Sequence, residues 1–205
     1  MTKRIGMLAL VAFLLCTATT ALAGTPYVNR QNGYAVTIPD GWIKMDSGAT
    51  GEVEDTIRAE GIDGMDPSFV EQHLPQIGQL DVAMFTTVDG MTNFNIAYQP
   101  MSWQYSAQEL VDTLAPIAIQ EYKTLFNDLT VVDAGSVQTI GNFAFCKVEI
   151  SAVSLGSEVG FAQYCYCGAS SIYVFTFTRT DSRVNRAPDL AALAQEVLTT
   201  FKPGN

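Results

Sequence analysis

The 205-residue chain has one histidine, His73, and no G-x-S-x-G motif around a serine. A Ser-His-Asp or Cys-His mechanism would have to use that single imidazole, and the motif that presents the serine of α/β-hydrolases is missing. The sequence therefore favours a solvated surface histidine over a catalytic one. It offers no set of catalytic residues, and we expect the chain not to be an enzyme.

Basic residues are also scarce. Eleven Lys and Arg stand against 21 Asp and Glu, which gives a net charge of −10, or −12 once Lys3 and Arg4 are removed with a signal peptide. An acidic protein repels phosphate backbones and gains nothing from anionic membrane surfaces. We therefore expect no nucleic acid partner, and instead a protein or small-molecule ligand whose identity the composition does not specify.

The N-terminus has the three parts of a cleavable export signal. Lys3 and Arg4 form a basic start, an apolar run covers residues 5–15, and Ala21-Leu22-Ala23 is an A-x-A cleavage site. The run is shorter than the roughly 20 residues that a membrane-spanning helix needs, so an uncleaved anchor is the less favoured alternative. We expect a signal peptide over 1–23, a secreted or periplasmic chain over 24–205, and no stable membrane anchor after cleavage.

No repeat or Pro/Ser-rich linker divides residues 24–205, so they are interpreted as one domain. Asn32-Gly33 and Asp89-Gly90 each predict a tight β-hairpin turn, because these residues tolerate positive φ. The hairpin strands are expected over 27–30 and 34–38, and over 81–88 and 92–99.

Residues 46–71 separate the two hairpins and differ in composition. They contain eight acidic residues and one basic residue, Arg58. They lack the Asp-x-Asp-x-Asp-Gly pattern of a calcium loop, so a solvated surface excursion is favoured over a calcium site.

One or two short helices fit the acidic segment, and two longer helices are expected beyond residue 100. The first begins at a capping box, Ser106 to Glu109, and Pro116 is expected to kink it. Its apolar stripe is Leu110, Leu114, Ile117, Ala118, Tyr122 and Leu125. The second helix follows Pro188, has an apolar stripe from Leu190 to Phe201, and ends at Pro203-Gly204.

Four strands are expected between these helices, over 129–140, 144–153, 158–166 and 171–178, and their short connections predict antiparallel pairing. Their apolar residues alternate onto both faces: Cys146 and Val148 lie on one face, Phe143 and Phe145 on the other. A sheet that is apolar on both faces needs a cover on both. We therefore predict an α+β domain in which helices cover both faces of an antiparallel sheet, an α/β/α sandwich.

Residues 33–42 read GYAVTIPDGW, an aromatic strand that runs into Pro-x-x-Trp. This segment resembles the signature of the PsbP-like family, which includes DcrB-like secreted bacterial proteins, and the order of elements is similar. The resemblance implies an α/β/α sandwich and an accessory or binding role. It transfers no catalytic, cofactor or metal-binding residue to this chain.

Three cysteines remain after residue 23: Cys146, Cys165 and Cys167. If Ser154 faces Ser157 across the hairpin, Cys146 lies directly opposite Cys165 on the same face. Two cysteines so placed are disulfide candidates in an oxidising compartment, and buried free thiols are the alternative.

The same cysteines give little support to redox or metal chemistry. Cys165-Tyr166-Cys167 is not the Cys-x-x-Cys of thiol oxidoreductases, and the three cysteines with His73 have no recognised zinc spacing. We expect no metal and no cofactor. The leading hypothesis is an exported, non-enzymatic accessory or binding module, and the alternative is an extracytoplasmic hydrolase or thiol-redox enzyme.

Overall fold

The computed structural model describes residues 24–45, 81–88, 91–126, 128–154, 157–181 and 190–204. The expected signal peptide (1–23), the acidic segment (46–71), His73, the Asp89-Gly90 turn and Pro188 lie outside the described residues.

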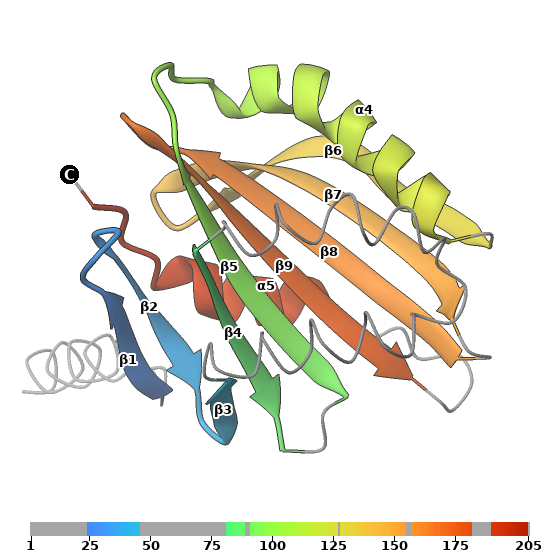
Figure 1. The fold of residues 1–205 in the computed structure, drawn as a ribbon, viewed down its shortest axis with the longest axis horizontal. Helices are drawn as coiled ribbons and strands as arrows, with labels where there is room; N and C mark the ends of the chain where they lie inside the picture. The colour runs from blue at the N-terminus through green and yellow to red at the C-terminus, as the bar shows by residue number, and fades with distance from the viewer. Residues whose placement is uncertain are drawn as a thin grey trace, which may run out of the picture.

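The core of the fold is a seven-stranded antiparallel sheet (Figure 1). Its strands, in spatial order, are β3 (Trp42–Met45), β4 (Asp81–Thr87), β5 (Thr92–Pro100), β9 (Ser171–Asp181), β8 (Ser157–Cys167), β7 (Phe143–Ser154) and β6 (Leu129–Ile140). The four strands from β6 to β9 pair in chain order, as their short connections predict. The pairing of β5 with β9 joins the two halves of the sheet across the intervening helix.

The first hairpin forms a separate two-stranded sheet of β1 (Gly24–Asn29) and β2 (Tyr34–Pro39). Gly33 has φ of +67°, the positive value that the Asn-Gly signal predicts, although the loop spans residues 30–33 because Asn29 pairs with Tyr34. The C-terminal residues attach this hairpin to the rest of the molecule. The N–H of Ala35 donates to the Lys202 carbonyl at 3.0 Å, and the N–H of Lys202 donates back to the Ala35 carbonyl at 2.9 Å.

Two helices are described, α4 (Ala107–Leu125) and α5 (Leu190–Thr199). The predicted start of α4 is confirmed. The Ser106 hydroxyl accepts the N–H of Glu109 at 3.2 Å, and the Glu109 carboxylate accepts the N–H of Ser106 at 2.7 Å. This reciprocal capping box satisfies two backbone donors that the first turn of a helix leaves without partners.

The two faces of the sheet carry separate cores. On one face, α5 and β2 pack over a mainly aromatic cluster centred on Phe201, whose ring lies 4.9 Å from Phe175 and 5.2 Å from Tyr173. On the other face, α4 covers a smaller cluster that includes Leu110, Cys146 and Val148. The predicted division of residues between the two faces of β7 is therefore the observed one.

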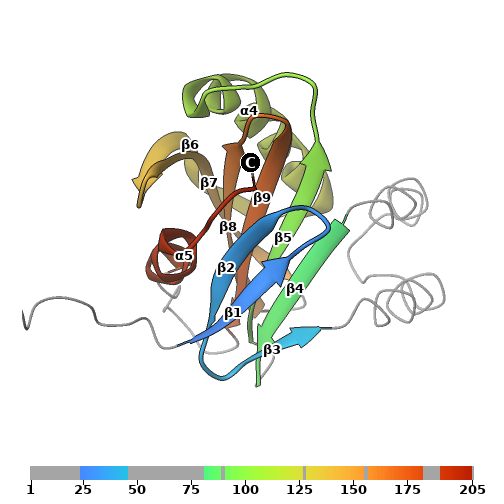
Figure 2. The same ribbon diagram turned by 90° about the vertical axis from the view of Figure 1, so that its left-hand side faces the viewer.

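The predicted α/β/α sandwich is wrong. Strands hold 59% of the described residues and helices 22%. Among the described residues, α4 is the only helix on one face, and it packs on β6, β7 and β8 (Figure 1). On the other face, the short helix α5 shares the cover with the β1–β2 hairpin, as Figure 2 shows from the side. The alternating pattern correctly showed that both faces are buried, but a β-hairpin can bury a face as well as a helix can.

Candidate functional site

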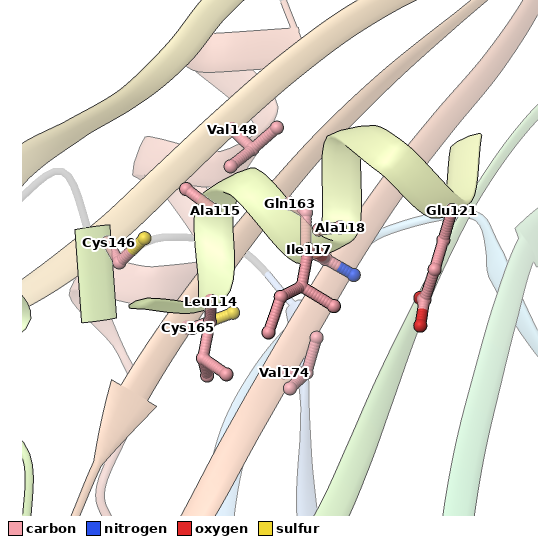
Figure 3. Close-up of a pocket in the computed structure, with 10 residues that line it drawn as sticks. All are labelled: Leu114, Ala115, Ile117, Ala118, Glu121, Cys146, Val148, Gln163, Cys165 and Val174. Carbon is pink, nitrogen blue, oxygen red and sulfur yellow. The ribbon is translucent and has the colours of Figure 1, made fainter. Parts of the chain in front are cut away.

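A cavity of about 240 Å³ lies between α4 and the sheet (Figure 3). Leu114, Ile117 and Ala118 form the helix wall, and Cys146, Val148, Gln163 and Cys165 contribute from the sheet. The wall is open to solvent at Ile117, which is 54% exposed. We refer to this cavity as the α4 pocket.

Small residues determine how α4 lies on the sheet beside this pocket. Gly135 of β6 has φ of +132°, and a Cβ atom at this position would stand 2.9 Å from the Ala115 Cβ and 3.3 Å from Val111 Cγ1. Strand β6 is also irregular here, with register shifts between Val131 and Ser136. Asp133 holds the irregular segment, because its carboxylate accepts the N–H of Gly135 at 3.0 Å and the Ser136 hydroxyl at 2.6 Å. A glycine within a bulge thus lets the helix approach this edge of the sheet closely.

Two thiols line the pocket from neighbouring strands. Cys146 of β7 is directly opposite Cys165 of β8, and Cys165 is in turn opposite Val174 of β9. The exposed fraction is 1% for Cys146 and 8% for Cys165. Burial raises the pKa of Cys146 to about 11, with a smaller contribution from the negative charge of Asp133. Burial likewise raises the pKa of Cys165 to about 12, with Cys146 as the second cause.

These shifts limit the chemistry of the pocket. The thiolate, not the thiol, is the nucleophile and the metal ligand. A pKa of about 11 or 12 keeps both cysteines neutral at physiological pH. The pair therefore behaves as small apolar side chains, and the pocket provides no activated nucleophile.

The third cysteine has a different environment. Cys167 accepts the backbone N–H of Tyr105 at 3.3 Å, and its sulfur lies 3.6 Å from the Gly168 carbonyl oxygen. This contact joins the end of β8 to the segment that leads into α4. Tyr105 packs against the α4-side core, whereas Trp103 beside it is 61% exposed.

Polar groups at the pocket are few. Glu121 is the only carboxylate among its lining residues and Gln163 the only amide. The Gln163 amide nitrogen lies 3.4 Å from the Thr176 hydroxyl. Glu121 is exposed on α4 and gives the pocket a negative edge.

Within the described parts of the chain, no group of three His, Cys, Asp or Glu side chains could hold a metal ion. No helix there is long and apolar enough to cross a membrane.

The structure brings together the two residues that the sequence singled out. Ser154 faces Ser157, and Cys146 faces Cys165, so the register predicted from the hairpin is the observed one. All three described cysteines are free thiols. The disulfide between Cys146 and Cys165 stays a prediction.

Sequence reasoning missed the pocket itself. It placed Ile117 in the buried stripe of α4, whereas Ala115 is the residue buried at 1% exposure and Ile117 lies at the pocket's edge. The available signal was the pair of small residues Ala115 and Ala118 on the inner side of α4. Small side chains on a packed face leave volume that only the facing sheet can fill.

No protein-family model matches the chain, and no curated protein matches it significantly. The PsbP-like resemblance is therefore not confirmed at the level of a family.

Solved structures do show a similar fold. LpqN, described as involved in cell envelope biogenesis of Mycobacterium tuberculosis, matches with a TM-score of 0.54 at 12% identity, over 91% of this chain and 93% of that one. A Bacteroides thetaiotaomicron protein matches with a TM-score of 0.50 at 13% identity, over 89% of this chain. The chain spans about half of the Bacteroides protein, 49% of its length. TplEi, a T6SS immunity protein of Pseudomonas aeruginosa, matches with a TM-score of 0.47 at 10% identity, over 87% of this chain and 96% of that one. At these identities, the likeness to LpqN and the Bacteroides protein concerns the fold alone.

Proposed function

We propose that the chain is an exported binding module without catalytic activity, and that the α4 pocket binds a small, uncharged apolar ligand. The observation that carries the proposal is the pocket's own chemistry: a half-open apolar cavity whose two cysteines carry no charge. A binding pocket of this type is mostly apolar with a few polar groups that orient the ligand. Gln163 would be that orienting group.

The size of the pocket limits the ligand. A volume of about 240 Å³ holds about eight water-sized groups, at a share of roughly 30 Å³ each. It is below the range of roughly 300–1,000 Å³ that is usual for drug-sized ligands. A single alkyl chain or one small ring fits this space. A helix of a protein partner, at roughly 10 Å across, does not.

Charge argues against an anionic ligand. The chain carries a net charge of −10, and Glu121 lies at the edge of the pocket. A carboxylate or phosphate head group beside Glu121 would be repelled, and no Lys or Arg is among the residues that line the pocket. An alkyl chain with an uncharged head group is compatible both with the apolar lining and with the negative charge of Glu121.

Three further features support the export part of the proposal. The N-terminal segment has the composition of a cleavable signal. The fold resembles that of LpqN, a protein described as acting in cell envelope biogenesis. The PsbP-like resemblance of residues 33–42 is also consistent with an accessory role outside the cytoplasm, and it remains part of this proposal.

Binding can be tested by calorimetric titration with hexyl, octyl and decyl glucoside, each below its micelle concentration. We expect affinity to rise with chain length until the pocket is filled. Ala118→Trp fills the pocket from α4 and should weaken binding at least about tenfold, since it removes the volume that the chain occupies. Gln120→Trp adds the same side chain at an exposed position of the same helix and should leave binding unchanged.

The outcomes separate binding from catalysis. Glucosides that do not bind, or that bind equally to the Ala118→Trp variant, would contradict the pocket as a ligand site. Hydrolysis of a generic ester panel that Cys146→Ser abolishes would instead support the alternative of a thiol-dependent enzyme.

A further inference from the structure

We propose that Cys146 and Cys165 form a disulfide between β7 and β8 in the floor of the α4 pocket, and that Cys167 remains a thiol. The inference does not depend on whether the pocket binds a ligand. It requires only that the chain folds where a disulfide oxidant is present, and it resolves the odd number of cysteines that follows residue 23.

The register selects this pair from the three possible ones. Directly opposed residues of antiparallel strands have Cα atoms about 4.5–5.5 Å apart, and disulfides span about 4.4–6.8 Å. Cys146 and Cys165 are such a pair. Cys146 and Cys167 are diagonal neighbours, at about 7–8 Å. Cys165 and Cys167 lie two residues apart on one strand, at about 6.8 Å, the upper end of the range.

The side chains also face the same way. Cys146 and Cys165 belong to the same core cluster under α4 and line the same cavity (Figure 3). Their side chains meet apolar neighbours there, Ala115 and Leu114 among the lining residues. The disulfide therefore replaces two S–H groups by one S–S bond. Its formation breaks no hydrogen bond described here for Cys146 or Cys165.

Cys167 is held in a different contact. Its sulfur accepts the N–H of Tyr105 at 3.3 Å and is 7% exposed. Pairing this sulfur with another cysteine would pull it from the part-buried N–H of Tyr105, and loss of a partner by such a donor is unfavourable. The third thiol thus has a structural role of its own, which is to hold the segment that leads into α4.

The chemistry is a two-step exchange with an external disulfide, such as oxidised glutathione or the active-site disulfide of an oxidoreductase. The thiolate of one cysteine attacks the oxidant's disulfide, forms a mixed disulfide and releases one thiolate. The thiolate of the second cysteine then attacks the mixed disulfide and releases the other. The pair loses two protons and two electrons, and the oxidant is reduced to two thiols.

Burial of the two cysteines determines the stage of folding at which this exchange can occur. Both cysteines lie beneath α4, where 1% of Cys146 and 8% of Cys165 is exposed in the folded chain. The exchange must therefore take place while the chain folds, before α4 docks. A chain that has folded in the reduced form should oxidise only as fast as α4 opens.

The test is disulfide mapping of the full-length chain. Cys16→Ser is carried in every sample so that only the three cysteines in question remain. The chain is unfolded and reduced, refolded in a glutathione redox buffer, quenched with acid, and alkylated in denaturant before digestion. Chymotrypsin cleaves after Phe145, Tyr164 and Tyr166, so the peptides that contain Cys146, Cys165 and Cys167 separate.

We expect a peptide that links Cys146 to Cys165 and a Cys167 peptide that carries the alkyl group. We also expect the oxidised chain to melt roughly 6–12 °C above the reduced chain, since the bond restrains a loop between residues 146 and 165. Three alkylated cysteines, a linkage that involves Cys167, or a crosslinked dimer would each overturn the proposal.

Two variants keep the result specific. Cys167→Ser should retain the linkage and the shift in melting temperature. Cys165→Ser should leave Cys146 and Cys167 both alkylated, because the diagonal pair is too far apart. A linkage between Cys146 and Cys167 in this variant would show that the register does not control pairing. Disulfide mapping of the chain that keeps all three cysteines gives its result whether or not either variant folds.

Discussion

Gly135 of β6 lies directly against Ala115 of α4, where a Cβ atom at position 135 would stand 2.9 Å from the Ala115 Cβ. The backbone of Gly135 also has φ of +132°, a region that residues with a side chain rarely adopt. The close approach of helix and strand at this point therefore depends on a glycine for two separate reasons. Ala115 lines the α4 pocket, so the contact with Gly135 positions part of the pocket wall.

We expect Gly135→Ala to lower the free energy of unfolding by at least about 2 kcal/mol, because it adds overpacking to backbone strain. Gly41→Ala is the matched control. Gly41 has φ of +80° but no atom within 4 Å of a Cβ at its position, so that variant carries the strain without the clash. Urea unfolding of both variants separates the two effects, and equal losses of stability would show that α4 does not press on β6.

Phe201 lies at the centre of the other core. Its ring is within 5.7 Å of Phe143, 5.6 Å of Tyr166 and 4.9 Å of Phe175, and the residue is 2% exposed. Phe201→Ala should cost about 3–5 kcal/mol, as is typical of a large core aromatic. Trp103→Ala removes a larger ring from a position that is 61% exposed and should cost less than about 0.5 kcal/mol. A small loss in Phe201→Ala would mean that α5 and the hairpin do not seal this face.

Short sequence motifs correctly predicted the features that depend on only a few neighbouring residues. The Asn32-Gly33 turn, the Ser106–Glu109 capping box and the facing of Ser154 and Ser157 are each specified within a few residues, and each is observed. Strand β3 was not predicted. Its four residues have no alternating pattern, since Ile43 and Met45 are exposed, and it exists because β4 pairs with it.

Sequence reasoning missed two features for the same reason: the packing of the β1–β2 hairpin on the sheet, and the α4 pocket. The sequence shows that β2 has an apolar face of Tyr34, Val36 and Ile38, but not whether it joins the large sheet or packs on it. The backbone contact between Ala35 and Lys202 decides this, and its two residues lie at opposite ends of the domain. The pocket depends equally on Gly135 and Ala115 meeting across the interface between strand and helix.

Glu121 should control which head groups the proposed ligand site accepts. We expect decanoate to bind more weakly than decyl glucoside, because its carboxylate would lie beside Glu121. A pair of like charges about 4 Å apart in water repels by about 1 kcal/mol, a factor of about five in affinity. Glu121→Gln should raise the affinity for decanoate by about that factor and leave the affinity for decyl glucoside unchanged. Calorimetric titration at low ionic strength measures both, and an unaltered preference would place the head group away from Glu121.

The two pocket thiols should make the stability of the reduced chain depend on pH in the alkaline range. Burial raises the pKa of Cys146 from 9.0 to about 11 and that of Cys165 from 9.0 to about 12. A raised pKa means that the folded state favours the protonated thiol. This stability is fully present below pH 9, the unfolded value, and is lost as the pH rises through the folded values.

The oxidised chain, whose disulfide has no proton to lose, provides the comparison. We expect the melting temperature of the reduced chain to fall more steeply from pH 9 toward pH 11 than that of the oxidised chain. Tyr122 also titrates in this range, because burial raises its pKa from 10.0 to about 12. The second cause of that shift is Cys165, so the difference between the two curves reports the two thiols together with the effect of Cys165 on Tyr122. Circular dichroism melts at fixed ionic strength measure it, and a reduced chain that lacks both thiols through Cys146→Ala and Cys165→Ala should follow the shallower slope. Parallel curves for the reduced and oxidised chains would mean that the two cysteines are not buried as thiols beneath α4.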